Sequence, residues 1–497
     1  VLVPEITLTH QIVGRLRARF GDALAVLHSG LRPGERVAEW ERLRRGERAI
    51  AVGARSALFA PLDDLGLVAV DEEHDGAYKN EEGFHYHARR LALRRARAAG
   101  CPLVLGSATP SLEARWAAER GELRRLVLSH RIGGRPLPAV ELVDLAKERA
   151  ALPRGRKLIL SRPLERAVAD ALAEGGQALL FLNRRGFSTQ ITCFACGRVE
   201  RCEHCDIALV FHADVERLRC HYCDFQAAPP ERCPGCGSDE SALLGVGTER
   251  VEEEVRSRFP AARIARLDRD VAGRRGATEA VLRALRERRV DVVVGTQMLA
   301  KGHDFPGVRV VGVVNADVGL HVPDFRAAER SFQLLTQVAG RAGRGGDPGR
   351  VVVQTHVPDH YALRAVVGHD DERFFREEIA QRAALGYPPC GSLARIVVSG
   401  EDPDATAAGA EALARASREA VARGGAPAAP TPAGRLEVLG PAPAPLARLR
   451  GRHRIQLLLK GPERSAVRGL ARAAARAAER LPRALQVQLD LDPVQML

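Results

Sequence analysis

The sequence predicts an α/β protein with two parallel-sheet domains, a cysteine-rich insertion in the second of them, and a small α+β domain after it. Short apolar runs alternate with helical stretches, which is typical of parallel sheets. Eight of the ten cysteines lie between residues 193 and 236, and the residues after 369 mix strand-like and helical runs. A chain of 497 residues is expected to form about three domains.

The composition is that of a soluble globular protein with a basic surface. Charged residues make up 28% and hydrophobic residues 45% of the chain, which is an ordinary balance. No apolar run approaches the roughly 18 residues of a membrane span and no cleavable leader is visible, so we expect a cytoplasmic protein without membrane contacts. The net charge of +13 favours a polyanionic partner such as nucleic acid, although mutational bias toward arginine can produce part of it.

The first domain is expected over residues 1–130. Its strands are predicted at the apolar runs Val1–Val3, Ala23–Leu27, Ala49–Val52, Leu65–Val70 and Leu103–Leu105. Ligands of an open parallel sheet bind at the carboxyl ends of its strands. Residues 131–165 come next, and their Gly and Pro residues break both helix and strand patterns, so we interpret this segment as an extended linker.

The second domain is expected over residues 166–369. Its strands are predicted at Ala178–Leu182, Val290–Val294, Val308–Val314 and Arg350–Gln354. The cysteine-rich insertion, residues 190–240, interrupts this domain after its first strand and can hang outside the sheet. The α+β domain is expected over residues 370–497 and opens with the charged helical run DDERFFREEIAQRAAL.

The cysteines of the insertion form four C-x2-C pairs. The pairs are Cys193 and Cys196, Cys202 and Cys205, Cys220 and Cys223, and Cys233 and Cys236. Two such pairs complete the four-thiolate shell of a structural zinc, whereas a disulfide framework belongs to small secreted chains, so we predict two zinc ions. The 14 residues between Cys205 and Cys220 favour joining the two middle pairs around one ion and the two outer pairs around the other, and the remaining pairings stay open.

A pair of carboxylates follows one strand of the first domain. The run LGLVAV ends in DEEH, residues 71–74, and we assign Asp71 to a magnesium ion that bridges nucleotide phosphates and Glu72 to the attacking water. The buried strand before them argues against a merely solvated acidic turn. The hydroxyl groups of GSATPS, Gly106–Ser111, can hydrogen-bond these carboxylates, although such a run also suits a helix N-cap.

Two further motifs indicate phosphate chemistry and base stacking. In QVAGRAGR, Arg341 and Arg344 are spaced by three on one expected helical face and can stabilise the charge of a transferring γ-phosphate; an exposed basic helix is the alternative. In YKNEEGFHYHARR, the side chains of Tyr78, Phe84 and Tyr86 can stack on bases. Packing in the core is the rival interpretation for Phe84.

The motifs PEITLT, VGARSALFAP, DEEH, GSATPS, LLFLNRRGF, GTQMLAKGHDF and QVAGRAGR resemble, in the right order, those of superfamily 2 helicases. The resemblance implies two RecA-like helicase lobes. The insertion lies between NRRGF and GTERVEEEV, and with LGYPPC and LDLDP it resembles the primosomal protein N′ (PriA) family of bacterial replication-restart helicases.

This resemblance implies an ATP-dependent 3′ to 5′ DNA helicase that recognises stalled or collapsed replication forks and initiates primosome assembly. Its cofactors would be two Zn²⁺ ions and ATP with Mg²⁺. Its partners would be branched and single-stranded DNA, the replicative helicase loading machinery and single-stranded-DNA-binding protein, and we expect a monomer. The residues implied are Gly302, Asp304 and Gln337 beside Asp71, Arg341 and Arg344 for nucleotide binding, with Gln337 also catalytic, and Pro4, Glu5, Thr7, Arg55 and Ser56 for the DNA strand.

One motif of the family is missing from the sequence. No G-x-x-x-x-G-K-[ST] loop, which cradles nucleotide phosphates, occurs in the 497 residues. In the family it lies shortly before the segment that corresponds to Val1, so we interpret the chain as a truncated copy that also lacks the amino-terminal DNA-binding region. The alternative is a non-hydrolysing, zinc-stabilised scaffold for fork DNA and primosome proteins, which has no chemical need for DEEH and QVAGRAGR.

We expect this chain alone to hydrolyse ATP negligibly, because no phosphate-binding loop is present to hold the β- and γ-phosphates. Phosphate release in the presence of single-stranded DNA measures this directly. Substantial DNA-stimulated release that Glu72→Gln abolishes would contradict the expectation and show that another segment binds the phosphates.

Overall fold

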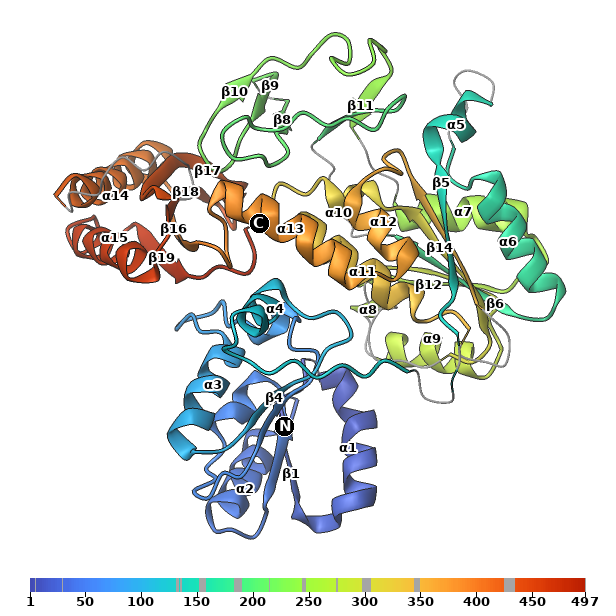
Figure 1. Ribbon diagram of the computed structural model, residues 1–497, viewed down its shortest axis with the longest axis horizontal. Helices are drawn as coiled ribbons and strands as arrows, with labels where there is room; N and C mark the ends of the chain where they lie inside the picture. Colours follow the sequence, from blue (N-terminus) through green and yellow to red (C-terminus); the bar gives the residue numbers. More distant parts are fainter. Residues whose placement is uncertain are drawn as a thin grey trace. The chain divides into compact units, whose positions relative to one another are not determined.

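A computed structural model describes residues 1–4, 6–28, 30–130, 134, 136–151, 158–182, 190–213, 215–243, 247–273, 276–296, 305–343, 349–423 and 434–496 (Figure 1). These residues divide into two compact units, Val1–Arg124 and Arg125–Leu497. Across the described residues, no helix combines the length and the apolarity needed to cross a membrane.

The first unit contains a parallel sheet. β1 (Leu24–Leu27) pairs with β2 (Ile50–Gly53), and β3 (Val68–Val70) pairs with β4 (Leu103–Leu105). Leu2 joins the two pairs, because it forms parallel bridges with both Gly53 and Val70. The strand predicted at residues 1–3 is thus reduced to one bridging residue, while the other four predicted strands are present.

The helices and 3₁₀ turns of this unit are α1 (Ile6–Phe20), η1 (Gly21–Ala23), α2 (Pro33–Arg44), η2 (Arg55–Phe59), η3 (Gly76–Tyr78), α3 (Ala88–Ala99) and α4 (Leu112–Glu119). α3 buries Ala88, Ala92 and Ala96, which share one helical face because they are spaced by four. The helix ends where Gly100 adopts a left-handed φ of 66°, a conformation that glycine takes without strain.

The second unit is built on a six-stranded parallel sheet. Its order is β12 (Ile264–Leu267), β13 (Val292–Gly295), β6 (Gln177–Leu182), β14 (Val308–Asn315), β15 (Arg350–Thr355) and β5 (Ala139–Asp144). All six residues of β6 are buried, as expected for a strand inside a parallel sheet. Gly312 of β14 lets α6 (Arg162–Ala173) approach, since a Cβ there would lie 2.5 Å from a methyl group of Leu164.

Sequence reasoning missed both outer strands of this sheet. The prediction of an extended linker over residues 131–165 is wrong for β5, which pairs in parallel with β15 from Ala139 to Asp144. The physical reason is that an outer strand is covered on fewer sides: β5 and β12 are only partly buried, so neither contains a continuous apolar run.

Nine helices are described around this sheet. They are α5 (Leu145–Ala150), α6 (Arg162–Ala173), α7 (Thr248–Arg258), α8 (Arg269–Ala272), α9 (Ala277–Arg286), α10 (Asp317–Leu320), α11 (Ala327–Ala339), α12 (Tyr361–Gly368) and α13 (Asp371–Leu385). Figure 1 shows the cysteine-rich module beside α10 and α12, outside the sheet, as expected for an insertion.

The cysteine-rich module contains two small antiparallel sheets. One is formed by β8 (Val210–His212), β9 (Arg217–Arg219) and β10 (Gln226–Ala227). The other pairs β7 (Ile191–Cys193) with β11 (Ser241–Leu243), with Cys193 opposite Ser241. The chain therefore enters and leaves the module on adjacent strands.

The C-terminal part is an α+β domain, as predicted. Its antiparallel sheet has the order β17 (Glu437–Leu449), β18 (Arg452–Gly461), β16 (Ser392–Gly400) and β19 (Gln486–Leu491), and its helices are α14 (Pro403–Arg423) and α15 (Arg464–Ala478). Alternate residues of β18 face opposite sides. Leu457 and Leu459 pack in the helix-covered core, whereas Leu458 packs against the cysteine-rich module.

Candidate functional site

The DEEH motif forms a turn at the carboxyl end of β3 in which consecutive carboxylates take different environments. Glu72 has a left-handed φ of 46°, a strained conformation for a non-glycine residue. Asp71 is exposed and the Glu72 side chain is 38% exposed, whereas Glu73 is 2% exposed. Desolvation at the strand end raises the pKa of Asp71, and the Glu72 N–H and His74 oppose this rise.

Glu73 is a structural residue. Its two carboxylate oxygens accept hydrogen bonds from the backbone N–H of Ser111 at 2.7 Å and from the Ser111 hydroxyl at 3.0 Å, and it forms an ion pair with Arg89 at 2.5 Å. Glu73 therefore holds the end of GSATPS and the start of α3 against the turn. A second link joins the two motifs, because the Ser107 hydroxyl lies 2.7 Å from Nδ1 of His74.

Tyr78 also stabilises the DEEH turn. Its ring is fully buried and its hydroxyl donates to the backbone carbonyl of Asp71 at 2.6 Å. Burial, followed by the nearby carboxylate of Asp71, raises the pKa of Tyr78. A buried ring offers no face to a base, so the expected stacking by Tyr78 does not fit this structure.

Phe84 and Tyr86 stand apart from Tyr78 in the aromatic loop. Phe84 is 79% exposed, which rules out the core-packing interpretation, and Tyr86 is half-buried beside it, with ring centroids 6.2 Å apart. Arg55 fixes the base of the loop by donating to the carbonyls of Ala77 at 3.2 Å and Lys79 at 3.0 Å. Arg55 therefore positions the aromatic loop, a role that the sequence did not suggest.

The remaining residues predicted to contact DNA are spread along the first unit. Ser56 is exposed in η2 beside Arg55, and Pro4 is buried. Thr7 lies in α1, and Glu5 lies outside the described residues.

The residues predicted to contact phosphate from the second domain lie around the end of α11. Gln337 is half-buried in the last turn, and Arg341 lies beyond the helix, which ends at Ala339. The expected helical face is therefore a turn at Arg341, whose N–H donates to the Val338 carbonyl at 3.0 Å. Gly302, Asp304 and Arg344 lie outside the described residues.

The eight cysteines gather into the two predicted groups. Cys193, Cys196, Cys233 and Cys236 form the outer cluster, and Cys202, Cys205, Cys220 and Cys223 form the inner cluster, with the sulfur atoms of each within 4.8 Å of one another. Three Sγ–Sγ distances are 3.5–3.6 Å, far above the ~2.0 Å of a disulfide. They approach the ~3.8 Å edge of a tetrahedron with Zn–S bonds of about 2.3 Å, so each cluster fits one zinc ion.

All four cysteine pairs adopt the same turn. In each, the residue directly after the second cysteine donates its N–H to the carbonyl of the first at 2.8–3.0 Å. These residues are Gly197, Asp206, Asp224 and Gly237, with φ between 50° and 74°. The pattern C-x2-C-[GD] is therefore a sequence signal for this turn, because Gly and Asp tolerate a left-handed backbone.

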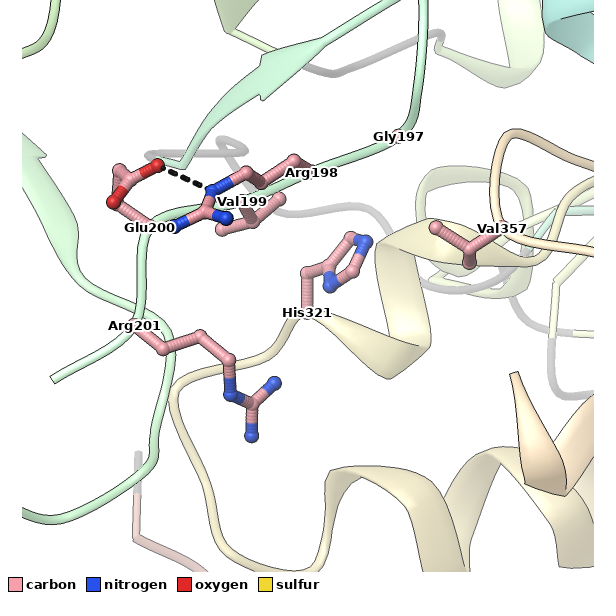
Figure 2. Close-up of a pocket in the computed structure, with 7 residues that line it drawn as sticks. All are labelled: Gly197, Arg198, Val199, Glu200, Arg201, His321 and Val357. Carbon is pink, nitrogen blue, oxygen red and sulfur yellow. Dashed lines mark hydrogen bonds and ion pairs between the residues drawn. The ribbon is translucent and has the colours of Figure 1, made fainter. Parts of the chain in front are cut away.

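The first turn of the outer cluster packs closely on the second domain. A Cβ on Gly197 would lie 2.6 Å from the His356 carbonyl oxygen and from a methyl group of Val357. Beside this contact is a pocket of about 340 Å³ (Figure 2), lined by Gly197, Arg198, Val199, Glu200, Arg201, His321 and Val357.

The charges around this pocket are largely matched. Arg198 donates to Glu200 at 3.0 Å, as Figure 2 shows, and Arg201 donates to Asp206 at 2.8 Å. Burial lowers the pKa of His321, which keeps this side chain neutral at pH 7. The pocket therefore offers little net charge to a ligand.

The inner cluster is joined to the C-terminal domain. The His221 carbonyl accepts from Nε2 of Gln456 at 2.7 Å, and Nδ1 of His221 lies 2.8 Å from the Pro443 carbonyl. The Tyr387 hydroxyl donates to the Cys205 carbonyl at 3.0 Å. Cys202, Cys205 and Cys220 are nearly inaccessible and belong to the apolar core of this junction.

The first unit has a parallel sheet with Asp71 and Glu72 at the end of one strand. The second unit has a parallel sheet and carries QVAGRAGR at the end of α11. These two parts define the two lobes of a helicase. Comparison with known families agrees: residues 1–115 match the DEAD/DEAH box helicase family and residues 247–346 match the helicase conserved C-terminal domain. Residues 202–227 match the PriA DNA helicase Cys-rich region, and residues 383–494 match the primosomal protein N C-terminal domain.

Curated relatives identify the family. The replication restart protein PriA of Treponema pallidum is 45% identical over 496 residues, which cover 100% of this chain and 72% of the relative. PriA of Bacillus subtilis is 45% identical over 460 residues, which cover 93% of this chain and 55% of the relative. The chain belongs to the replication restart protein PriA family, and it spans about half the length of the Bacillus relative.

A structure of RecG bound to a three-way DNA junction matches 76% of this chain and 39% of that chain, with a TM-score of 0.41 and 16% sequence identity.

The purified chain is expected to contain two zinc ions, one in each cluster. Cys205→Ser and Cys236→Ser should each reduce the zinc content by about one ion, because a zinc site rarely keeps its affinity after losing a thiolate. Cys205→Ser should also lower the melting temperature more, since Cys205 is 3% exposed whereas Cys236 is exposed. Metal analysis and thermal unfolding measure both effects, and one zinc in the unmodified chain would contradict the assignment.

Gly197→Ala should destabilise the protein more than Gly237→Ala, by about 1–3 kcal/mol, the usual range for overpacking. Both residues occupy the same left-handed turn position, with φ of 72° and 74°, but a Cβ on Gly237 would meet nothing within 4 Å. The backbone strain is therefore shared and only the contact with the second domain differs. Urea unfolding of the two variants gives the comparison, and equal losses would show that the module does not pack on this domain.

Proposed function

We propose that this chain supplies the motor lobes, zinc module and C-terminal domain of an ATP-dependent 3′ to 5′ DNA helicase. In this proposal it recognises stalled or collapsed replication forks in the cytoplasm, binds branched and single-stranded DNA, and initiates primosome assembly. Its protein partners are the replicative helicase loading machinery and single-stranded-DNA-binding protein, and it acts as a monomer. The observation that carries the proposal is the DEEH turn in a chain of the PriA family.

The DEEH turn supports a division of labour in ATP hydrolysis. Asp71 would hold a magnesium ion, which would supply positive charge to the nucleotide phosphates. Asp71 suits the metal because the residue is exposed at the strand end, and Glu72 suits the attacking water because its side chain is partly exposed beside Asp71, whereas Glu73 is buried. His74 lies 3.6 Å from Glu72 and 2.7 Å from Ser107. It can therefore couple the Glu72 carboxylate to the GSATPS motif.

The second lobe supplies the groups that stabilise charge on the transferring phosphate. We assign this part to Arg341 and Arg344, with Gln337, Gly302 and Asp304 completing the nucleotide contacts. Arg341 lies two residues after the end of α11, whose last turn carries Gln337. The proposed domain limits are residues 1–130 for the first lobe, 166–369 for the second and 370–497 for the C-terminal domain, with β5 reassigned to the second lobe.

DNA contacts are proposed for the first lobe. Phe84 and Tyr86 provide base-stacking rings, and Arg55 positions their loop. The path of the DNA strand is lined by Ser56, Pro4, Glu5 and Thr7. Stacking is tolerant of sequence because every base has a π-face, which suits a motor that moves along DNA.

A chimera tests the helicase proposal. The segment of the Treponema pallidum relative that precedes the region matched by this chain is joined to residue 1, and the product is assayed on forked DNA. We expect DNA-stimulated ATP hydrolysis and strand separation, because the family resemblance implies that the added segment contains the phosphate-binding loop. Glu72→Gln should abolish both while fork binding persists, since the carboxylate acts on water and not on DNA.

The matched control is Glu122→Gln, which removes an exposed carboxylate of the same unit that pairs with Arg120 at the surface. It should leave turnover unchanged. A chimera that binds forked DNA tightly yet neither hydrolyses ATP nor separates strands would overturn the helicase proposal in favour of a zinc-stabilised scaffold.

A further inference from the structure

We propose that Phe59 is a third base-stacking residue of the first unit, which with Phe84 and Tyr86 holds an unstacked base of single-stranded DNA. The inference rests on the proposed function, in which this unit binds the DNA strand. Phe59 belongs to η2, a segment separate in sequence from the aromatic loop, and it adds a ring that sequence reasoning did not single out.

The three rings lie together at an exposed position. Phe84 stacks beside Tyr86 with an interplanar angle of 25°, and Phe59 meets Tyr86 edge to face, with ring centroids 5.5 Å apart and planes at 79°. Phe59 is 56% exposed and Phe84 is 79% exposed. Burying a phenylalanine side chain is worth roughly 1.5–3 kcal/mol, so two exposed rings that share one neighbour leave apolar area for a flat ligand to cover.

The segments that carry the rings are fixed before any ligand binds. Arg95 of α3 donates to the carbonyls on both sides of Phe59, namely those of Leu58 and Ala60. Arg55 of the same turn ties η2 to the aromatic loop through the carbonyls of Ala77 and Lys79. Arg95 therefore fixes the backbone on both sides of Phe59, and Arg55 fixes η2 to the aromatic loop.

The aromatic loop is closed on itself. The Asn80 side chain donates to the carbonyls of Glu82 at 2.6 Å and Phe84 at 2.8 Å, and its backbone N–H donates to the Tyr86 carbonyl at 2.8 Å. Little ordering entropy is lost when a ligand meets a surface held in this way.

The charges near the rings are of both signs. Glu81 and Glu82 are exposed in the same loop as Phe84, and like charges repel, so the tip of the loop disfavours the phosphate backbone, whereas the cationic Arg55 and Arg95 lie on the η2 side. The π-face of a base carries no net charge and can stack on the rings. The ligand class is therefore the nucleobase, with the phosphates directed away from Glu81 and Glu82.

The test uses the whole chain and two labelled oligonucleotides of equal length, one of thymidine and one of abasic sites. Fluorescence anisotropy measures both affinities for Phe59→Ala, Phe59→Leu and Phe59→Tyr. We expect Phe59→Ala and Phe59→Leu to weaken binding of the thymidine strand about tenfold, within the range for loss of one stacked base, and to leave abasic binding unchanged. Phe59→Tyr should restore affinity because it keeps the ring.

The matched control is Phe20→Ala, which removes a 42% exposed ring of the same unit that contacts Arg19, and it should alter neither affinity. If Phe84→Ala weakens thymidine binding but no Phe59 variant does, the inference about Phe59 is wrong and the proposed DNA contact stands. If neither position affects thymidine binding, both are wrong. Equal loss of affinity for the thymidine and abasic oligonucleotides, or no rescue by Phe59→Tyr, would show that Phe59 acts in folding. Either result would overturn its proposed role in base stacking.

Discussion

The four thiolates of the inner zinc cluster hold the short turn of His221 and Tyr222, and the assembly of the second unit depends on this turn. One zinc ion fixes the backbone from both sides, because Cys220 and Cys223 flank the two residues. The His221 carbonyl then accepts from Gln456 of the C-terminal sheet, and the Tyr222 hydroxyl accepts from the Phe325 N–H of the second lobe at 3.3 Å. Metal binding and domain assembly are thus coupled through two adjacent residues.

The DEEH turn of the first unit shows how strain and support are divided among neighbouring residues. A left-handed non-glycine residue costs on the order of 1–3 kcal/mol and persists only where its surroundings hold it. Around Glu72 the support comes from Glu73, which binds Ser111 and Arg89, and from Tyr78, which binds the carbonyl of Asp71. The buried residues Glu73 and Tyr78 thus stabilise the turn. Asp71 and Glu72, which are proposed to act in ATP hydrolysis, stay accessible.

Sequence patterns predicted what depends on local spacing. The cysteine spacing gave the correct grouping of all eight thiols, and apolar runs located the inner strands. The outer strands β5 and β12 were missed because half-buried strands lack such runs. Tyr78 and Phe84 are both aromatic residues in one polar loop, and only tertiary packing buries the first and exposes the second. Likewise, nothing local distinguishes Gly197 from Gly237, since the difference is a neighbour distant in sequence. The assigned roles in nucleotide and DNA binding remain predictions.

The pairing of β7 with β11 has a consequence for how such a chain can be assembled from parts. Ile191 lies opposite Leu243, and Cys193 lies opposite Ser241. The two ends of the module are therefore adjacent, so the module is connected to the lobe in the same way as a β-hairpin. The entropy of closing a loop rises only logarithmically with its length. A metal-bearing module can therefore be added to or removed from a lobe of this kind during evolution with little change in the register of the surrounding sheet.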